Sequence, residues 1–242
     1  MGLKHPDTFV ALGPYCGYVD THQFSETPGM NFVKVGALPD HQEKVLRMLD
    51  SMDYAANAGV VPAIGAIGEK DPFFQAHVIM GAAMQREGLK MVNLISPGTA
   101  HVQDPTTFKE QLRQIGEYAD KGRNLLPRSL RFVTWTLKYS RCYLVEVLGL
   151  KEHYQRAEID AKLDESGTVI LKQPRNITRF ALIPPPDTAP FCRVVIDGKP
   201  IELPSKPQTS GQKRVVLEWQ GTKWQVVGER EVGKRREKRP GL

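Results

Sequence analysis

Two short apolar runs, each followed by a helical pattern, make residues 60–105 the part of the sequence that most constrains the fold. Residues 60–67 form an apolar run bounded by glycine and proline, which is typical of a strand buried on both faces of a parallel sheet. Residues 90–95 form a second such run, after a helical stretch that begins at Pro72 and ends at Gly88. The order strand, helix, strand, helix predicts an α/β arrangement.

An acid and a histidine follow the two predicted strands. Asp71 lies just after the first strand, and His101 lies just after the second, in the loop PGTAH. Functional groups of an open α/β sheet gather outside the carboxyl ends of its strands, so we expect these two side chains to meet. A carboxylate that accepts a hydrogen bond from one imidazole nitrogen leaves the other nitrogen free as a base. Gly68 and Gly98 allow the tight turns that such loops need.

Simpler explanations exist for each residue of this pair. Asp71 precedes Pro72 and therefore also fits a helix N-cap. A single loop histidine such as His101 is often a surface or packing residue. His77, on the helix between the two strands, is expected to be exposed and without a role.

Neither the cysteines nor the other histidines have metal-ligand spacing. The three cysteines are widely separated: Cys16, Cys142 and Cys192. The histidines near the start of the chain form no H-x-H or H-x-x-x-H pattern: His5, His22 and His41. We therefore expect no disulfide framework, no metal and no cofactor.

The positive charge of the chain is concentrated at one end. Residues 228–242 carry six basic and three acidic side chains, which is half of the net charge of +6 that the 242 residues carry. No aromatic residue lies among them, so we expect a solvated segment, with phosphate or nucleic-acid contact as the alternative. No run approaches the roughly 18 apolar residues of a membrane helix, and no signal peptide is visible. The sequence predicts neither a nucleic-acid nor a membrane partner.

The character of the sequence changes near residue 127. Residues 1–37 show no sustained periodicity and are expected to be loops, and a helix is expected from Asp40 to near Gly59. The side chains expected to face the core are Val45, Leu46, Met48 and Leu49 from this helix, and Phe108, Leu112, Ile115 and Tyr118 from a third helix beginning at Asp104-Pro105. Beyond residue 127 the period becomes two, and RFVTWTL and CYLVEVLGL predict a hairpin around the turn KYSR. Further strands are expected at 168–172, 178–183, 192–196, 214–219 and 223–227, with a turn at Asp197-Gly198. We thus expect an α/β domain over 1–126 and a β-rich, sandwich-like domain with a basic tail over 127–242.

The segment VPAIGAIGEKDPFFQAHVIMGAAMQREGL, followed by ISPGTAHVQDP, resembles the C-terminal part of the prolyl oligopeptidase family of serine peptidases, within the α/β-hydrolase superfamily. The resemblance implies hydrolysis of peptide or ester bonds, with Asp71 as the triad acid and His101 as the triad base. The region from FVTWTLKYSRCYLVEVLGL to EHYQRAEIDAKL is similar to the β-rich extension of large bacterial members of this group.

The sequence departs from this family in one respect, because it contains no G-x-S-x-G nucleophile elbow. Ser25, Ser51 and Ser96 lack the flanking glycines, and Cys16 in PYCGY has Pro14 at the position of the first glycine. We expect Cys16 to be a buried cysteine and the chain alone to be inactive. Either the nucleophile and the oxyanion hole belong to a missing N-terminal half of the same polypeptide, which we favour, or the chain is a non-catalytic homologue that binds a partner through its β-rich domain.

Overall fold

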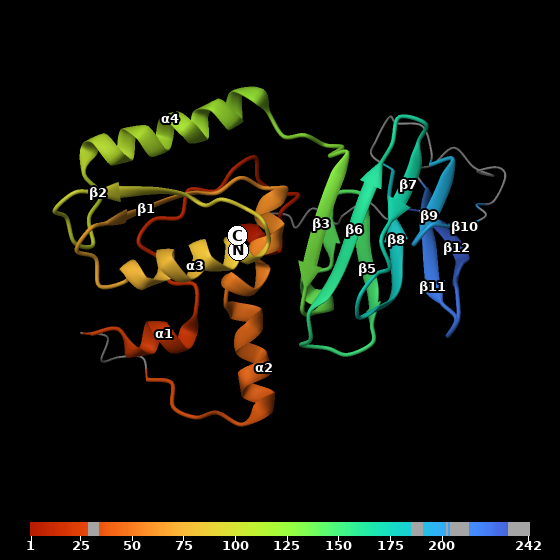
Figure 1. The fold of residues 1–242 in the computed structure, drawn as a ribbon, viewed down its shortest axis with the longest axis horizontal. Helices are drawn as coiled ribbons and strands as arrows, with labels where there is room; N and C mark the ends of the chain where they lie inside the picture. Colours follow the sequence, from red (N-terminus) through yellow and green to blue (C-terminus); the bar gives the residue numbers. More distant parts are fainter. Residues whose placement is uncertain (29–33, 185–190, 202, 204–212, 232–242) are drawn as a thin grey trace, which may run out of the picture.

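The computed structural model describes residues 1–28, 34–184, 191–201, 203 and 213–231, and it contains both helices and several sheets. Figure 1 shows helices around a small sheet in the first half of the chain, with a stack of β-strands beside them formed by the second half. Within these residues, no helix is both long enough and apolar enough to cross a membrane.

The small sheet has the strand and helix order expected from the sequence. Strands β1 (Ile64–Gly68) and β2 (Val92–Ser96) pair in parallel over their full length. Helices α3 (Phe74–Arg86) and α4 (Pro105–Lys121) lie on opposite sides of this sheet (Figure 1). All five residues of β1 are buried, as a strand covered on both faces requires.

The first 28 residues are more ordered than their sequence indicated. Leu12 forms a single parallel bridge with Ala63, just before β1. Tyr15 forms a second one with Ala66, within β1. A 3₁₀ turn, η1 (Gly2–Lys4), and a short helix, α1 (Thr21–Glu26), complete this segment. The Asp20 side chain caps α1 by accepting a hydrogen bond from the Gln23 N–H at 2.8 Å. The expectation of loops throughout 1–37 was therefore wrong, because elements this short leave no periodic pattern, and residues 29–33 of that stretch lie outside the described part.

The faces of several helices also differ from expectation. Helix α2 (Asp40–Leu49) buries none of its residues, and the following turns to Gly59 are a separate 3₁₀ segment, η2 (Met52–Gly59). Most of the side chains expected in the core from α2 and α4 are exposed: Val45, Leu49, Phe108, Leu112 and Tyr118. The remaining three are partly buried: Leu46, Met48 and Ile115. In α4 the buried side chains are instead Thr107 and Gln111. The helical period showed which face is apolar, but not whether another element covers it.

The second half folds into two five-stranded sheets that share one core. One sheet has the order β10-β9-β7-β6-β3 and the other β12-β11-β8-β5-β4, and only the β7–β9 pair is parallel among the pairs described there. Phe132 and Ile159 from the first sheet pack with Phe180 and Leu217 from the second. The strands are β3 (Ser129–Thr134), β4 (Arg141–Cys142), β5 (Val145–Leu150), β6 (Ala157–Leu163), β7 (Thr168–Leu171), β8 (Ile177–Leu182), β9 (Arg193–Ile196), β10 (Lys199–Ile201), β11 (Lys213–Trp219) and β12 (Trp224–Glu231).

One predicted hairpin forms and another does not. Asp197 and Gly198 both have positive φ, 49° and 75°, and they join β9 to β10 as a tight turn. The expected pairing of RFVTWTL with CYLVEVLGL is wrong, because β3 pairs with β6 whereas β5 pairs with β4 and β8. The 3₁₀ turn η3 (Leu137–Tyr139), capped by the Thr136 side chain, separates β3 from the opposite sheet, to which β4 and β5 belong.

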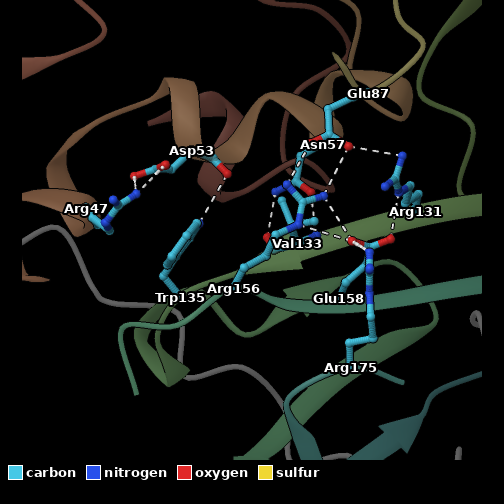
Figure 2. Close-up of polar contacts among 10 residues, drawn as sticks. All are labelled: Arg47, Asp53, Asn57, Glu87, Arg131, Val133, Trp135, Arg156, Glu158 and Arg175. Carbon is cyan, nitrogen blue, oxygen red and sulfur yellow. Dashed lines mark hydrogen bonds and ion pairs between the residues drawn. The ribbon is translucent and has the colours of Figure 1, made fainter. Parts of the chain in front are cut away.

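Asn57 joins the two halves of the molecule. Its side chain is fully buried in η2, and its amide nitrogen donates to the carbonyl oxygens of Leu3 at 2.7 Å and Val133 at 3.0 Å. Its carbonyl oxygen accepts from the Val133 N–H at 2.8 Å, so the amide pairs with β3 as a neighbouring strand would (Figure 2). The Trp135 indole N–H adds a bond to the Asp53 carbonyl oxygen at 3.2 Å.

Replacing Asn57 by alanine should lower the free energy of unfolding by about 3 kcal/mol or more, because three buried backbone groups would lose their partners, at roughly 1–3 kcal/mol each. Urea unfolding followed by circular dichroism measures this change. Asn124→Ala, which removes an exposed loop amide and its one exposed hydrogen bond from the Leu126 N–H, is the control and should change stability by less than about 0.5 kcal/mol. An equal effect of both substitutions would contradict this role of Asn57.

A cluster of charged side chains lies beside Asn57. Glu158 on β6 accepts hydrogen bonds from Arg131, Arg156 and Arg175, and Glu87, just after α3, pairs with Arg131 and Arg156 (Figure 2). Burial raises the pKa of Glu158, but the hydrogen bonds from the arginines outweigh burial and lower that pKa to about 2. Through ionised groups, the cluster therefore connects the end of α3 to the five-stranded sheet that contains β3 and β6.

This lowered pKa predicts acid sensitivity. A carboxyl group with a folded-state pKa below its unfolded value of about 4.3 stabilises the fold above that value, and the contribution is lost as the pH falls toward 2. Glu158→Gln should therefore cost most stability near pH 6, and the difference from the native protein should shrink between about pH 4.5 and 2. Thermal unfolding across this range tests it, with exposed Glu165→Gln as the control. A difference that does not change with pH would contradict the assignment.

Candidate functional site

Asp71 and His101 meet, as the sequence predicted, at the carboxyl ends of β1 and β2. The register pairs Gly68 with Ser96, so the residues that follow the two strands begin side by side. The Nδ1 atom of His101 lies 3.0 Å from Oδ2 of Asp71. The chain thus brings together two side chains that are about thirty residues apart in the sequence.

Gly68 allows the histidine loop to approach the end of β1. A Cβ at this position would overlap the carbonyl oxygens of Thr99 and Ala100, so no other residue fits without moving the loop. The Lys70 N–H donates to the Thr99 carbonyl oxygen at 2.8 Å, and the Gly98 N–H donates to the Glu69 carboxylate at 2.7 Å. These bonds fix the loop that carries His101.

The two side chains differ sharply in burial. The Asp71 side chain is fully buried, whereas 55% of the His101 side chain is exposed. The second carboxylate oxygen of Asp71 accepts the Phe73 N–H at 2.8 Å. The N-cap of α3 is Phe73, with no side-chain cap, so the alternative interpretation of Asp71 as the helix N-cap was wrong. The rings of Phe73 and Tyr15 lie 5.4 Å and 6.4 Å from the imidazole, centroid to centroid, and limit its movement.

This geometry suits a base held by a carboxylate. An ionised Asp71 can only accept, so the bond places a proton on Nδ1 of His101 and leaves Nε2 as the basic nitrogen. Within the described residues, the structure records no hydrogen bond to Nε2. Nε2 therefore keeps its hydrogen-bonding capacity on a side chain that is more than half exposed.

Cys16 lies next to this pair. Its sulfur and the ligand atoms of Asp71 and His101 all lie within 4.8 Å of one another. Burial and a hydrogen bond with Asp71 raise the pKa of the thiol to about 11, so the sulfur is protonated at neutral pH. The sequence correctly predicted that Cys16 is buried but missed its position, which depends on the bridge between Tyr15 and Ala66. Its proximity does not make it an activated nucleophile, because the reactive form of cysteine is the thiolate.

The cysteines should differ in their reaction with iodoacetamide. At pH 7.5 the exposed Cys192 should be alkylated at least ten times faster than Cys16, because Cys16 is buried and its thiol pKa is raised. Cys142, which is completely buried, should react only on unfolding. Peptide mass spectrometry over time gives the three rates. Faster alkylation of Cys16 than of Cys192 would show an activated thiolate and would contradict this description.

No serine of the described residues forms a hydrogen bond with His101 in the structure. Ser25 donates to the His22 carbonyl oxygen at 2.8 Å, and the buried Ser96 accepts from the Asp104 N–H at 3.1 Å. Both hydroxyl groups therefore have structural roles.

His77 is buried, and the expectation that it is exposed was wrong. Its Nδ1 pairs with the Asn93 side chain, and burial lowers its pKa, which keeps it neutral. The ring lines an apolar cavity of about 500 Å³ together with Met80 and Met84. Asp71 and His101 are not among the residues that line this cavity. The next residue of α3, Val78, is exposed instead.

Most of the basic segment expected to be solvated lies outside the described residues, which end at β12. Comparisons with protein-family models, with curated proteins and with solved structures find no match for this chain.

Proposed function

We propose that this chain carries the acid and the base of a serine hydrolase of prolyl oligopeptidase type, with the fold of the C-terminal part of an α/β-hydrolase sheet. The observation that carries the proposal is the bond between buried Asp71 and exposed His101 at the ends of two parallel strands. The substrate class is a peptide or an ester, and the nucleophile comes from a serine outside these 242 residues.

Each residue has a distinct part in the proposed reaction. Nε2 of His101 takes the proton of the serine hydroxyl as its oxygen attacks the substrate carbonyl carbon. Asp71 holds the ring by Nδ1 and stabilises the imidazolium that forms, and the same proton then passes to the leaving group. In the second half His101 removes a proton from water, which cleaves the acyl-enzyme and restores the serine.

The surface of α4 is consistent with a further segment that covers this part of the molecule. Phe108 and Leu112 are each about half exposed, and Tyr118 is 37% exposed, along one side of the helix. Exposed apolar patches of this kind mark interaction sites. In the proposal, the N-terminal half of the same polypeptide packs here and brings its nucleophile to His101.

The reading frame upstream of Met1 tests this proposal. We expect it to continue in frame through a strand, a G-x-S-x-G elbow and a helix, and we expect the extended polypeptide to hydrolyse p-nitrophenyl esters while residues 1–242 alone do not. An extended polypeptide without this elbow, or one that folds but hydrolyses neither esters nor peptides, would overturn it.

A binding protein without catalysis is the second candidate. Trp219 and Trp224, 5.7 Å apart between ring centroids, line a cavity of about 460 Å³ next to β9 and β10. Aromatic side chains in a hollow are typical of ligand sites, which favours recognition of a polymer or partner by the β-rich half. Binding that is lost in Trp219→Ala, in a protein with no hydrolase activity, would support this candidate over the first.

A further inference from the structure

Three chemically different donors converge beside the end of β1. The thiol of Cys16, the carboxylate of Asp71 and the imidazole of His101 come from three separate segments, and their ligand atoms lie within 4.8 Å of one another. Such a set does not arise from the packing of one helix or one loop. Only His101 of the three is exposed, so the group has one side open to solvent.

The backbone holds Cys16 in an unusual conformation. Its φ is 44°, in the left-handed region that residues other than glycine rarely adopt. The Cys16 N–H donates to the Ala66 carbonyl oxygen in β1 at 3.2 Å, and Tyr15 forms its bridge to the same residue. The surrounding structure compensates for the unfavourable energy of this backbone conformation, as is often seen at functional sites.

The donor types match those of zinc. Zn²⁺ binds cysteine sulfur, histidine nitrogen and carboxylate oxygen at about 2.0–2.3 Å, and catalytic-type sites have three protein ligands with a fourth position left for water. Donors in a tetrahedral site are thus roughly 3–4 Å apart, so the present arrangement needs to contract by only about 1 Å. The Phe73 N–H holds the other oxygen of Asp71 at 2.8 Å, which is the supporting bond that metal-binding carboxylates usually have.

We propose that Cys16, Asp71 and His101 bind a Zn²⁺ ion, with a water molecule in the fourth position. The thiol proton leaves to solvent when the sulfur binds. The Nδ1 proton of His101 also leaves to solvent while Nε2 takes one up, so the imidazole stays neutral and Nδ1 has a free lone pair for the ion. The ion takes the donor atoms that Asp71 and His101 otherwise use for each other, so metal occupancy and the acid–base pair exclude one another. From the sequence we expected no metal, because no cysteine or histidine has the spacing of a known metal-binding motif. Ligands at positions 16, 71 and 101 are too far apart in the sequence to form such a motif.

Titration of metal-free protein with Co²⁺ tests the site directly and does not depend on hydrolase activity. The unsubstituted chain should develop the near-ultraviolet absorption of a cobalt–thiolate bond, saturating at one ion per chain and abolished by added Zn²⁺. Cys192→Ser is the matched control, because Cys192 is an exposed thiol away from the three ligands, and it should leave the band unchanged. Cys16→Ser should remove the band.

His101→Gln provides a second variant, because the exposed His101 can be changed with little risk to the fold. Its affinity for Co²⁺ should fall at least tenfold, with the far-ultraviolet circular dichroism unchanged. No saturable thiolate band in the unsubstituted chain would overturn the site, as would a band that survives in Cys16→Ser or an unchanged affinity in His101→Gln. Esterase measurements on the extended polypeptide decide separately on the proposed function, so failure of either proposal can be recognised.

Discussion

Replacing His101 by alanine should lower the ester turnover of the extended polypeptide by a factor on the order of 10⁴ or more. The substitution removes Nε2, the atom that moves the proton of the nucleophile in the proposed reaction, and it removes the imidazole that pairs with Asp71. The exposed ring contributes little to the core, so the fold should be retained. Steady-state kinetics on both forms give the ratio, and circular dichroism checks the fold.

His41→Ala is the matched control for this loss. His41 is an exposed histidine on α2, so its removal changes the same residue type away from the proposed site. Its turnover should stay within a factor of two of the unsubstituted polypeptide. Near-normal turnover in His101→Ala would mean that the pairing with Asp71 is structural only.

Asp71→Asn should lower turnover by roughly 10⁴-fold while the geometry around it changes little. An asparagine amide placed against Nδ1 can donate a hydrogen bond, which favours the imidazole tautomer with its proton on Nε2. That tautomer cannot accept the proton of a nucleophile. Because Asp71 acts through His101, the nitrogen chemical shifts of the His101 ring should show the change of tautomer in the same variant.

The exposed Asp120 on α4 offers a control for this substitution. Asp120→Asn should change neither turnover nor the His101 nitrogen shifts. If Asp71→Asn loses activity only because the protein unfolds, the far-ultraviolet spectrum will show it. A folded Asp71→Asn form with the original tautomer and full turnover would contradict the role assigned to the acid.

The sequence predicted the Asp71–His101 contact because simple rules govern it. Both residues follow strands of one strand–helix–strand unit, and parallel strands that are neighbours have their carboxyl ends together. Knowledge of the rest of the sheet was not needed. The close approach of the histidine loop also depends on a glycine, Gly68, that is visible in the sequence.

Cys16 could not be placed in the same way. Its position depends on the bridge of Tyr15 to Ala66, which pairs an irregular segment with β1 and leaves no alternating pattern in the sequence. The positive φ of Cys16 could not be predicted either. A glycine would have indicated this backbone conformation, but the glycine in this segment is the next residue, Gly17, and the surrounding structure imposes the conformation on Cys16.

Strand partners were harder to predict than strands. The strand pattern of β3 and β5 was recognised, but an alternating pattern does not say which strand lies alongside which. The chain passes from one sheet to the other through η3, so β6 becomes the neighbour of β3. The turn at Asp197-Gly198 was predictable because its residue types themselves favour positive φ.

Labelling of the extended polypeptide with a fluorophosphonate probe shows whether His101 activates a serine nucleophile. We expect a covalent adduct on the serine of an upstream G-x-S-x-G elbow, formed at least 10³-fold more slowly in His101→Ala and at the normal rate in His41→Ala. Labelling that is equally fast without His101, or a folded extended polypeptide that forms no serine adduct, would contradict the assignment of Asp71 and His101 as the acid and base of a serine hydrolase.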